Sequence, residues 1–283
     1  MVCPKRLMPR SSPLSRQLDR PRAGGTLYPT HRLSLLAALL ASSLILGCSV
    51  PASDGWQLAF ADTGTEHWTD GWFLEGDKAA VATTPEGMVL TAGPVPGENA
   101  SHAVLWTQRS FSGDVKVEYT YTRLDTMLSV NAVNILYLQA TGLGTDDAPR
   151  DIVRSTRQRA VPTMSHYYLG MNALHVSYAT TGPRRAHYVS ARRYPASSIP
   201  DFPSTQIQPI YEDVELFEPG RPYRITATKE GGRLTFIVEG DDGTRTFAWD
   251  TTAFPPVEDG RIGFRHMWTR SARYRDIRIS VRP

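Results

Sequence analysis

The chain has 283 residues, enough for one large hydrophobic core, and a formal net charge of +3. The first 47 residues hold seven of its 31 Lys and Arg and one of its 28 Asp and Glu, so the remainder carries a net charge of −3. This balance gives no support for nucleic-acid binding through bulk positive charge. The only cysteines are Cys3 and Cys48, which excludes an internal disulfide, thiolate chemistry or a cysteine metal site after residue 48.

The first 47 residues have the pattern of a bacterial export signal. Seven basic residues precede the apolar run LSLLAALLASSLIL at 33–46, which is too short for a stable membrane span. Gly47 and Cys48 follow, as in lipoprotein signals that are cleaved before an acylated cysteine. We expect a signal peptide over 1–47, a lipid-anchored Cys48 with a tether over 48–55, and one domain over 56–283. An ordinary signal peptide is the alternative. The lipoprotein interpretation places the domain at the bacterial cell envelope, facing the periplasm or the exterior.

After residue 55 the sequence shows the two-residue alternation of β-strands and almost no helical periodicity. VKVEYTYT at 115–122 alternates Val and Tyr with polar residues. Similar segments, separated by Gly, Pro, Asp and Asn, occupy 134–140, 171–178, 186–194, 222–230, 232–240, 244–250, 261–268 and 273–281. Many short alternating strands predict an all-β sandwich or jelly roll. The long connections at 141–165 and 195–221 have lengths typical of functional or mobile loops.

The segment MNALHVSY at 171–178 carries the first candidate site residues. Alternation puts Asn172, Leu174, Val176 and Tyr178 on one face of the strand and His175, between small residues, on the other. A histidine hydrogen-bonded into the sheet is the simpler explanation, and a histidine that faces a ligand is the other. Unless a β-bulge intervenes, Asn172 and Tyr178 cannot share one site with His175.

Arginine dominates the region around this strand. Residues 150–193 contain eight arginines, no lysine and one acidic residue, Asp151. Guanidinium groups bind carboxylate or sulfate with paired hydrogen bonds, tyrosine rings suit sugar rings, and His or Tyr can transfer protons. Arginines solvated on loops are the alternative. In the strand at 186–194, Arg192 shares a face with Tyr188 and Tyr194.

RIGFRHMW at 261–268 adds a further arginine. Ile262 and Phe264 are expected in the core, so Arg265 points to the opposite face beside Gly263, and His266 is expected at the edge of the core.

Familiar catalytic strings are absent from the sequence. It contains no GxSxG, HExxH, P-loop, dinucleotide fingerprint or EF-hand loop, and no metal-ligand spacing. No stripe of paired carboxylates is present, which disfavours a retaining glycosidase. A hydrolase with carboxylates from separate strands stays open, with Glu118, Glu212 and Asp276 as candidates.

Several motifs together resemble an uncharacterised bacterial jelly-roll family found in rhamnogalacturonan-utilisation clusters. They are MNALHVSY with the downstream pair Arg192 and Arg193, PYRITATKEGGRLTFIVEG, GRIGFRHM and YRDI, and the likeness spans roughly residues 68–280. The family is similar to concanavalin A-like lectin/glucanase sandwiches. The resemblance implies two curved antiparallel sheets with a saccharide groove on the concave one, and it implies no settled reaction.

Two details of the resemblance concern individual residues. In SHYYLGM the order of His and Tyr departs from the family pattern, which makes His166 less secure than His175. Sandwiches of this kind often hold a structural calcium ion between the first and last strands, where Asp62 or Asp276 would supply an oxygen.

Residue chemistry and resemblance together predict an enzyme that degrades an acidic, uronate-containing polysaccharide or oligosaccharide by β-elimination. Arg192 and Arg265, with Asn172, would neutralise the uronate carboxylate, and His175 or a tyrosine would take the proton at C5. The expected catalytic residues are His175, Tyr178, Tyr188 and Arg192, and the expected substrate-binding residues are Asn172, Arg265, Tyr167, His166 and Arg193. No cofactor is expected, and the structural calcium ion stays an unassigned alternative because no ligand spacing supports it. The alternatives are a glycoside hydrolase of the same fold and a non-catalytic surface glycan-binding lipoprotein.

Overall fold

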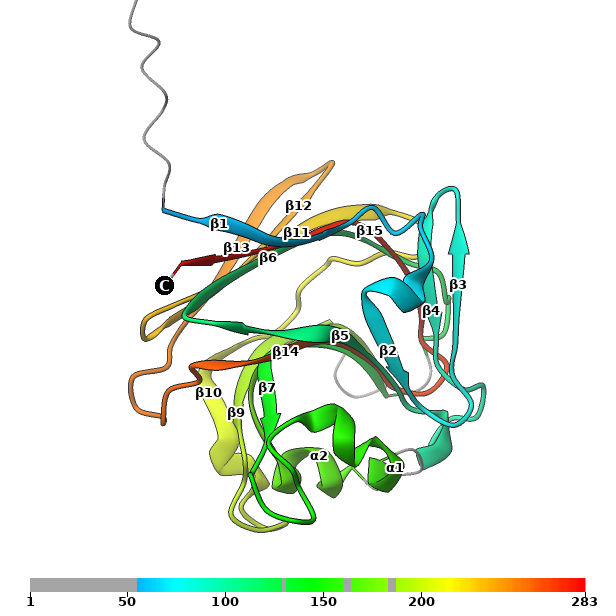
Figure 1. Cartoon of the computed structure of the whole chain (residues 1–283). Coiled ribbons are helices and arrows are strands. Elements are labelled where there is room, and N and C mark those ends of the chain that lie inside the picture. The colour runs from blue at the N-terminus through cyan, green and yellow to red at the C-terminus, as the bar shows by residue number, and fades with distance from the viewer. Residues whose placement is uncertain (1–54, 129–130, 160–163, 183–186, 283) are drawn as a thin grey trace, which may run out of the picture. The chain divides into compact units, whose positions relative to one another are not determined.

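Two antiparallel β-sheets pack face to face in the computed structural model, which describes residues 55–128, 131–159, 164–182 and 187–282 (Figure 1). The predicted signal peptide, Cys48 and the tether up to residue 54 lie outside the described residues. The predicted all-β sandwich of two antiparallel sheets is confirmed.

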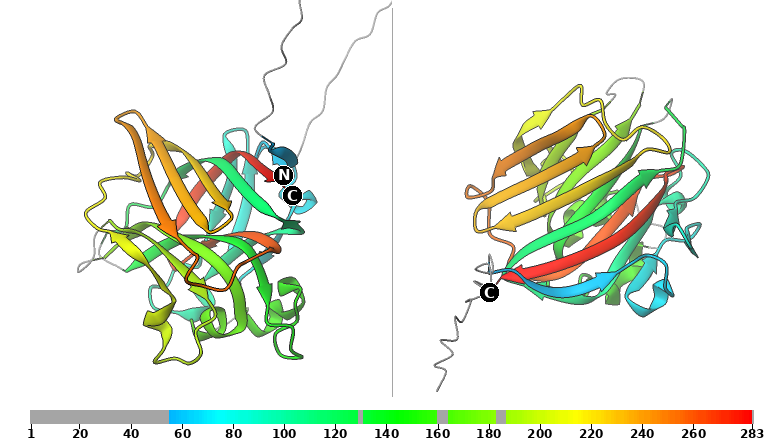
Figure 2. Two further views of the ribbon diagram at one scale, coloured as in Figure 1. Left: turned by 90° about the vertical axis from the view of Figure 1, so that its left-hand side faces the viewer. Right: turned by 90° about the horizontal axis from the view of Figure 1, so that it is seen from above.

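The eight-stranded sheet lies uppermost in Figure 1, and Figure 2 shows its strands side by side. Its strands are, in spatial order, β13 (Gly243–Asp250), β12 (Arg233–Gly240), β11 (Pro222–Glu230), β6 (Asp114–Arg123), β15 (Ser271–Arg282), β4 (Gly87–Thr91) and β3 (Ala80–Thr84), with β1 (Gln57–Asp62) paired to β15. Because Gln57 pairs with Val281, the two ends of the described domain lie beside each other.

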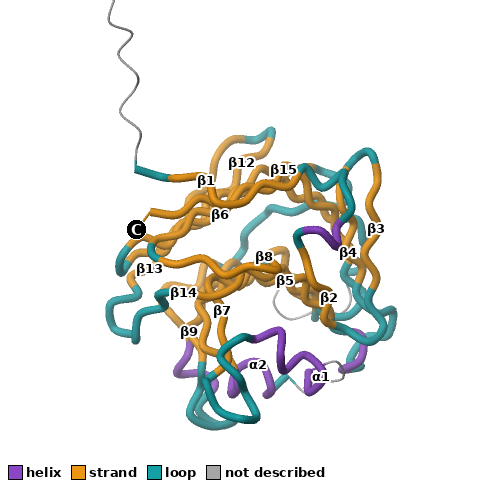
Figure 3. The backbone as a smooth tube through the Cα atoms, in the orientation of Figure 1, coloured by secondary structure: helices purple, strands orange, loops and turns teal. Residues whose placement is uncertain are grey.

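The seven-stranded sheet lies between the first sheet and the helices α1 and α2. Its strands are, in spatial order, β10 (Gln206–Tyr211), β9 (Val189–Tyr194), β8 (Met171–Thr181), β7 (Ala132–Gly142), β14 (Asp259–His266), β5 (Ala103–Ser112) and β2 (Trp72–Glu75). The short helices are η1 (Trp68–Asp70), η2 (Asn99–Ser101), η3 (Ile152–Ser155), α1 (Thr156–Arg159), α2 (Ser165–Gly170) and η4 (Phe202–Thr205). Figure 3 shows α1 and α2 on the side of this sheet that faces away from the other sheet, which we call its outer face.

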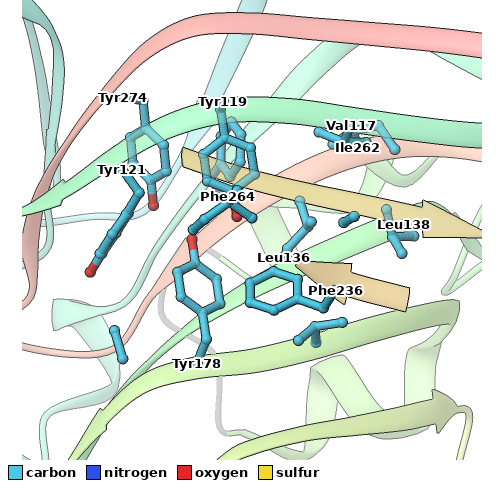
Figure 4. Close-up of a cluster of buried hydrophobic side chains, with 14 of the residues drawn as sticks. Val117, Tyr119, Tyr121, Leu136, Leu138, Tyr178, Phe236, Ile262, Phe264 and Tyr274 are labelled. Atoms are coloured by element: carbon cyan, nitrogen blue, oxygen red, sulfur yellow. The ribbon is translucent and has the colours of Figure 1, made fainter. Parts of the chain in front are cut away.

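The main core fills the space between the sheets and is rich in aromatic rings (Figure 4). Tyr119 of β6 lies edge-on to Phe264 of β14, with ring centroids 4.9 Å apart, and Phe264 stacks on Tyr274 of β15 at 4.3 Å. As alternation predicts, Ile262 and Phe264 point into this core. His266 is also buried there, and its Nε2 lies 2.8 Å from the Tyr274 hydroxyl.

A second apolar cluster covers the outer face of the seven-stranded sheet. Trp106 of β5, Tyr137 of β7 and Tyr194 of β9 pack there against Ile152 and Tyr167 from the helical segments. The central strands are therefore buried on both faces. None of the helices in the part of the chain that the structure describes has the length and hydropathy needed to span a bilayer.

Candidate functional site

A row of side chains crosses the outer face of the seven-stranded sheet under α2. Trp106 of β5 pairs in register with Gly263 of β14, Gly263 with Tyr137 of β7, Tyr137 with His175 of β8, and His175 with Arg192 of β9. Directly paired residues on adjacent strands project to the same face. A Cβ at position 263 would lie 2.4 Å from the Trp106 ring, so glycine lets the indole lie across β14. The indole then stacks on Tyr137 at 5.3 Å.

Arg265 lies on the same face, two residues after Gly263, and its exposed fraction is 0%. Its Nη2 donates to His102 Nδ1 at 2.9 Å and to Met164 Sδ at 2.7 Å, and the guanidinium lies 4.5 Å from the Tyr167 ring centroid. Within the described residues no carboxylate forms an ion pair with this group, and Nε and Nη1 make no hydrogen bond of full geometry, although the Tyr137 hydroxyl lies close enough to the guanidinium to interact with it. A buried guanidinium without an anion is strongly unfavourable, by several kcal/mol or more in order of magnitude.

His175 completes the polar part of the row. Its ring lies between those of Tyr137, at 5.6 Å, and Tyr194, at 4.7 Å. Neither ring nitrogen has a hydrogen-bond partner in the described parts of the chain. Burial lowers the pKa of His175 well below its usual range, and the charges of Arg192 and Arg265 lower it further. The imidazole is therefore neutral at neutral pH and can accept a proton.

The positive charge of Arg265 also affects the pKa values of His102 and Tyr137. Burial, assisted by Arg265, lowers the pKa of His102 to about 2, so its Nδ1 is a fixed acceptor for the guanidinium. Burial raises the pKa of Tyr137, and the nearby Arg265 charge partly opposes this effect. The Tyr137 hydroxyl is fully buried, and among the residues described it interacts with the Arg265 guanidinium without full hydrogen-bond geometry. It therefore stays protonated and can donate.

Glu75, at the end of β2, joins the helical segments to the sheet. Its Oε1 accepts from Arg159 Nε at 2.9 Å and from the Tyr167 hydroxyl at 3.0 Å, while its Oε2 accepts from Arg159 Nη2 at 2.8 Å and from Trp106 Nε1 at 3.0 Å. It is the only buried carboxylate among the described residues. Four donors occupy its oxygens, so it is not available as a base.

Four of the residues predicted from sequence meet on the outer face of the seven-stranded sheet. His175 and Arg192 belong to the row of side chains, and Arg265 and Tyr167 lie against each other beside it. Arg192 Nη1 donates to the Phe202 carbonyl at 3.2 Å and to Thr205 Oγ1 at 3.0 Å.

Three other predicted residues lie on the opposite face of the sheet. Tyr178 is buried between the sheets, 5.3 Å from the Phe236 ring (Figure 4). Asn172 Oδ1 accepts from Arg193 Nη2 at 2.6 Å, and Arg193 Nε donates to the Pro255 carbonyl. These three therefore do not line one site with His175, because successive strand residues face opposite sides. The catalytic role predicted for Tyr178 and the ligand contacts predicted for Asn172 and Arg193 gain no support from this placement.

The remaining two predicted residues lie at the margin. His166 is exposed on α2 and, with Arg159 and Leu143, lines a surface hollow of about 470 Å³. Tyr188 is half-buried just before β9, where its backbone N–H donates to Thr180 Oγ1.

Sequence reasoning missed Tyr137, Trp106, His102 and Glu75. Tyr137 lies between Leu136 and Leu138 in the sequence, and both leucines point into the inter-sheet core. Alternation therefore places Tyr137 on the outer face once the leucines are assigned to the core. His102 precedes β5, whose first five residues are all buried and show no alternation. Neither His102 nor Glu75 carried a sequence signal.

The calcium and hydrolase candidates lie elsewhere. Asp62 already accepts from the Gly64 N–H and Trp72 Nε1, and Asp276 is exposed and pairs with Arg275. No group of three His, Cys, Asp or Glu suited to a metal occurs among the described residues.

The other two hydrolase candidates, Glu118 and Glu212, are also outside the cluster. Glu118 lies on β6 of the eight-stranded sheet and pairs with Arg224 of the adjacent strand β11. Glu212 is exposed.

Comparison with solved structures defines the class as a lectin-like β-sandwich. The chain is similar to a protein of unknown function with a galectin-like fold from Bacillus subtilis, with a TM-score of 0.60 and 20% identity over 81% of this chain and 100% of that chain. It is similar to lectin II from Ulex europaeus, with a TM-score of 0.51 and 12% identity over 80% and 99%. The exoplasmic/lumenal domain of VIP36, in a Ca²⁺/Man₃GlcNAc-bound form, has a TM-score of 0.51 and 11% identity over 78% and 90%.

The sequence places the chain more narrowly. Residues 63–279 match the model of a domain of unknown function, DUF1961, and the chain belongs to this family. It is 24% identical over 193 residues to the uncharacterized protein YesU of Bacillus subtilis strain 168, which covers 64% of this chain and 78% of YesU. The predicted membership of an uncharacterised jelly-roll family is confirmed.

Proposed function

We propose that the protein binds an acidic saccharide on the outer face of the seven-stranded sheet, with the sugar carboxylate held by Arg265. The observation that carries this proposal is the full burial of Arg265, which within the described residues has no carboxylate partner and whose Nε and Nη1 make no hydrogen bond of full geometry. A carboxylate supplies the missing acceptor and the compensating charge. The sugar-bound form of the similar VIP36 domain supports a saccharide as the rest of the ligand.

The chemistry of the neighbouring side chains fits β-elimination. Arg265 neutralises the carboxylate, which makes the proton on the adjacent C5 more acidic. Neutral His175 takes this proton, the electron pair forms the C4=C5 double bond, the C4–O bond breaks, and the Tyr137 hydroxyl protonates the departing oxygen. A well-placed donor on developing charge contributes about 3–4 kcal/mol, and proton transfer contributes roughly 10²–10⁴-fold. Hydrolysis is disfavoured because the oxygens of Glu75 are fully occupied.

One observation favours a second function, non-catalytic glycan binding. The pKa of His175 is lowered so far by burial and by two arginines that the free imidazole is a weak base. A bound carboxylate would offset the Arg265 charge and raise this pKa. If the pKa of His175 does not rise on binding, the same residues would bind the saccharide without catalysing a reaction.

Product absorbance and calorimetry on the same variants test the proposal. Acting on uronate glycans, the wild-type protein should generate the ultraviolet absorbance of an unsaturated uronate. His175→Gln and Tyr137→Phe should remove that absorbance while binding persists, and Arg265→Lys should weaken binding of uronates but not of neutral sugars. Tyr178→Phe is the matched control, because its hydroxyl lies between the sheets. Binding without product in the wild-type protein identifies a glycan-binding protein. A failure of every uronate to bind refutes the proposal.

For the location we propose lipid anchoring at Cys48 in the bacterial cell envelope. The proposal is supported by the order of basic region, apolar run, Gly47 and Cys48. Metabolic labelling with a fatty-acid analogue should mark the wild-type protein and not Cys48→Ser. Equal labelling of both would contradict it.

A further inference from the structure

We infer that a small oxyanion binds between the two sheets, in a hollow beside the connection from β13 to β14. The hollow has a volume of about 250 Å³, and both Arg193 of β9 and Lys229 of β11 line it. Arg193 pairs in register with Leu174, which lies in the inter-sheet core, so the hollow is separate from the outer face that carries the proposed saccharide site. The inference therefore goes beyond the proposed function and does not depend on it.

Two cationic side chains enter the hollow from opposite sheets. Arg193 comes from the seven-stranded sheet, and Lys229 comes from the eight-stranded sheet, where it continues the core-facing row of Tyr223, Ile225 and Ala227. The exposed fractions of Arg193 and Lys229 are 6% and 7%. Within the described residues neither of them forms an ion pair with a carboxylate, and no acidic side chain lines the hollow. Because a buried charge without a counter-charge is costly, an anion in this hollow would stabilise the folded protein.

The Arg193 guanidinium is only partly satisfied by the protein. Its Nε donates to the Pro255 carbonyl at 2.8 Å, and its Nη2 donates to Asn172 Oδ1 at 2.6 Å and to the Pro256 carbonyl at 3.2 Å. A guanidinium has five N–H groups, so the two on Nη1 have no acceptor in the described parts of the chain. Burial lowers the pKa of Arg193 to about 10, which leaves it charged at neutral pH. Nη1 can therefore donate two hydrogen bonds to an anion.

The Lys229 ammonium also has a donor left. Its Nζ donates to the Gly113 carbonyl at 2.8 Å and to the Val257 carbonyl at 2.9 Å, whereas an ammonium has three N–H groups. Burial lowers the pKa of Lys229, and the charges of Asp114 and Glu258, which form no ion pair with it, partly oppose this effect. The third N–H and the positive charge are therefore available to a ligand.

The lining of the hollow defines the class of ligand. A carboxylate, sulfate or phosphate group supplies several acceptor oxygens and the negative charge that both cations lack. Leu174, Phe254 and Val257 form apolar parts of the wall, and low polarity strengthens the attraction between an anion and the two cations. The volume is below the range of about 300–1,000 Å³ that is typical of pockets for drug-sized ligands. We therefore expect an inorganic oxyanion or one acidic monosaccharide.

Titration calorimetry tests the inference with three probes at constant ionic strength in chloride: inorganic sulfate, inorganic phosphate and monomeric galacturonate. At least one probe should bind saturably. Lys229→Met removes the charge at similar length, and Arg193→Lys retains the charge but removes the Nη1 donors, so each should weaken that binding by about tenfold or more. Arg245→Met, at an exposed position on β13, is the matched control and should keep the wild-type affinity. The galacturonate titration is repeated in Arg265→Lys, so that binding at the outer face is not counted.

The probes also distinguish the two sources of the anion. Binding of sulfate or phosphate without galacturonate identifies a free inorganic ion, and galacturonate binding that sulfate displaces identifies a sugar carboxylate. Wild-type affinity in folded Lys229→Met and Arg193→Lys would overturn the inference, and so would the absence of saturable binding by all three probes.

Crystals grown with the probe that binds, with selenate in place of sulfate, locate the anion even if both variants fail to fold. Density for the probe between Arg193 and Lys229 supports the inference. Density at the protein surface alone identifies an adventitious ion only and contradicts it.

Discussion

Mild acid should destabilise this protein before its carboxylates begin to titrate, because three of its histidines are buried in neutral form. Burial lowers the pKa of His102 to about 2 and of His266 to about 3, and it lowers the pKa of His175 well below the usual range. In the unfolded chain a histidine titrates near about 6.5. Below that pH the unfolded state takes up protons that the folded state does not, so the free energy of unfolding falls as pH falls.

The size of the effect follows from the pKa values of His102 and His266. Each histidine lowers the free energy of unfolding by about 1.4 kcal/mol per pH unit between its unfolded and folded pKa. At about pH 5, His102 and His266 together therefore reduce stability by about 4 kcal/mol relative to neutral pH, and His175 acts in the same direction. A typical domain has about 5–15 kcal/mol in total, so the loss is large.

Urea unfolding followed by tryptophan fluorescence, between about pH 7.5 and about pH 5, measures this slope. His266→Gln removes one titrating group from the unfolded state, so its slope should be shallower than that of the wild type by about 1.4 kcal/mol per pH unit. His67→Gln, at an exposed position, is the control and should keep the wild-type slope. A wild-type free energy of unfolding that stays constant over this range would refute the reasoning.

Three further predictions concern individual contacts. Glu75→Gln leaves Arg159 as an unpaired buried charge and should lower the free energy of unfolding by about 3–5 kcal/mol, whereas Glu118→Gln, at a partly exposed pair, should change it by less than about 1 kcal/mol in the same urea titration. Gly263→Ala pushes a Cβ into the indole ring on the next strand and should cost about 1–3 kcal/mol, and an unchanged midpoint would contradict the stacking described here. In the elimination assay Tyr137→Phe should lose roughly 10²-fold or more and Tyr178→Phe should stay near wild type; equal losses would disprove the assignment of faces.

Strand positions were readable from sequence where one face of a strand is polar. The segment 222–230 was predicted with the boundaries that β11 has, and 244–250 matches β13 within one residue. In contrast, β1 to β5 were missed, and β10 was missed because Pro209 interrupts a short edge strand.

The helices over the outer face were also missed. η3, α1 and α2 have four to six residues each, too few to show helical periodicity. Their positions depend on tertiary contacts such as those of Glu75 with Arg159 and Tyr167. Local propensity does not specify these contacts.

The sequence by itself determined the sandwich fold and the faces of the candidate side chains that lie on strands. Alternation placed His175 and Arg265 away from the inter-sheet core and separated Tyr178 from His175, because side chains of successive strand residues point to opposite sides. Only the tertiary structure decided which strands are neighbours, and with them the row from Trp106 to Arg192. Strand order depends on long-range packing, so the juxtaposition of Tyr137 with His175 and the burial of Arg265 appear only in the folded protein.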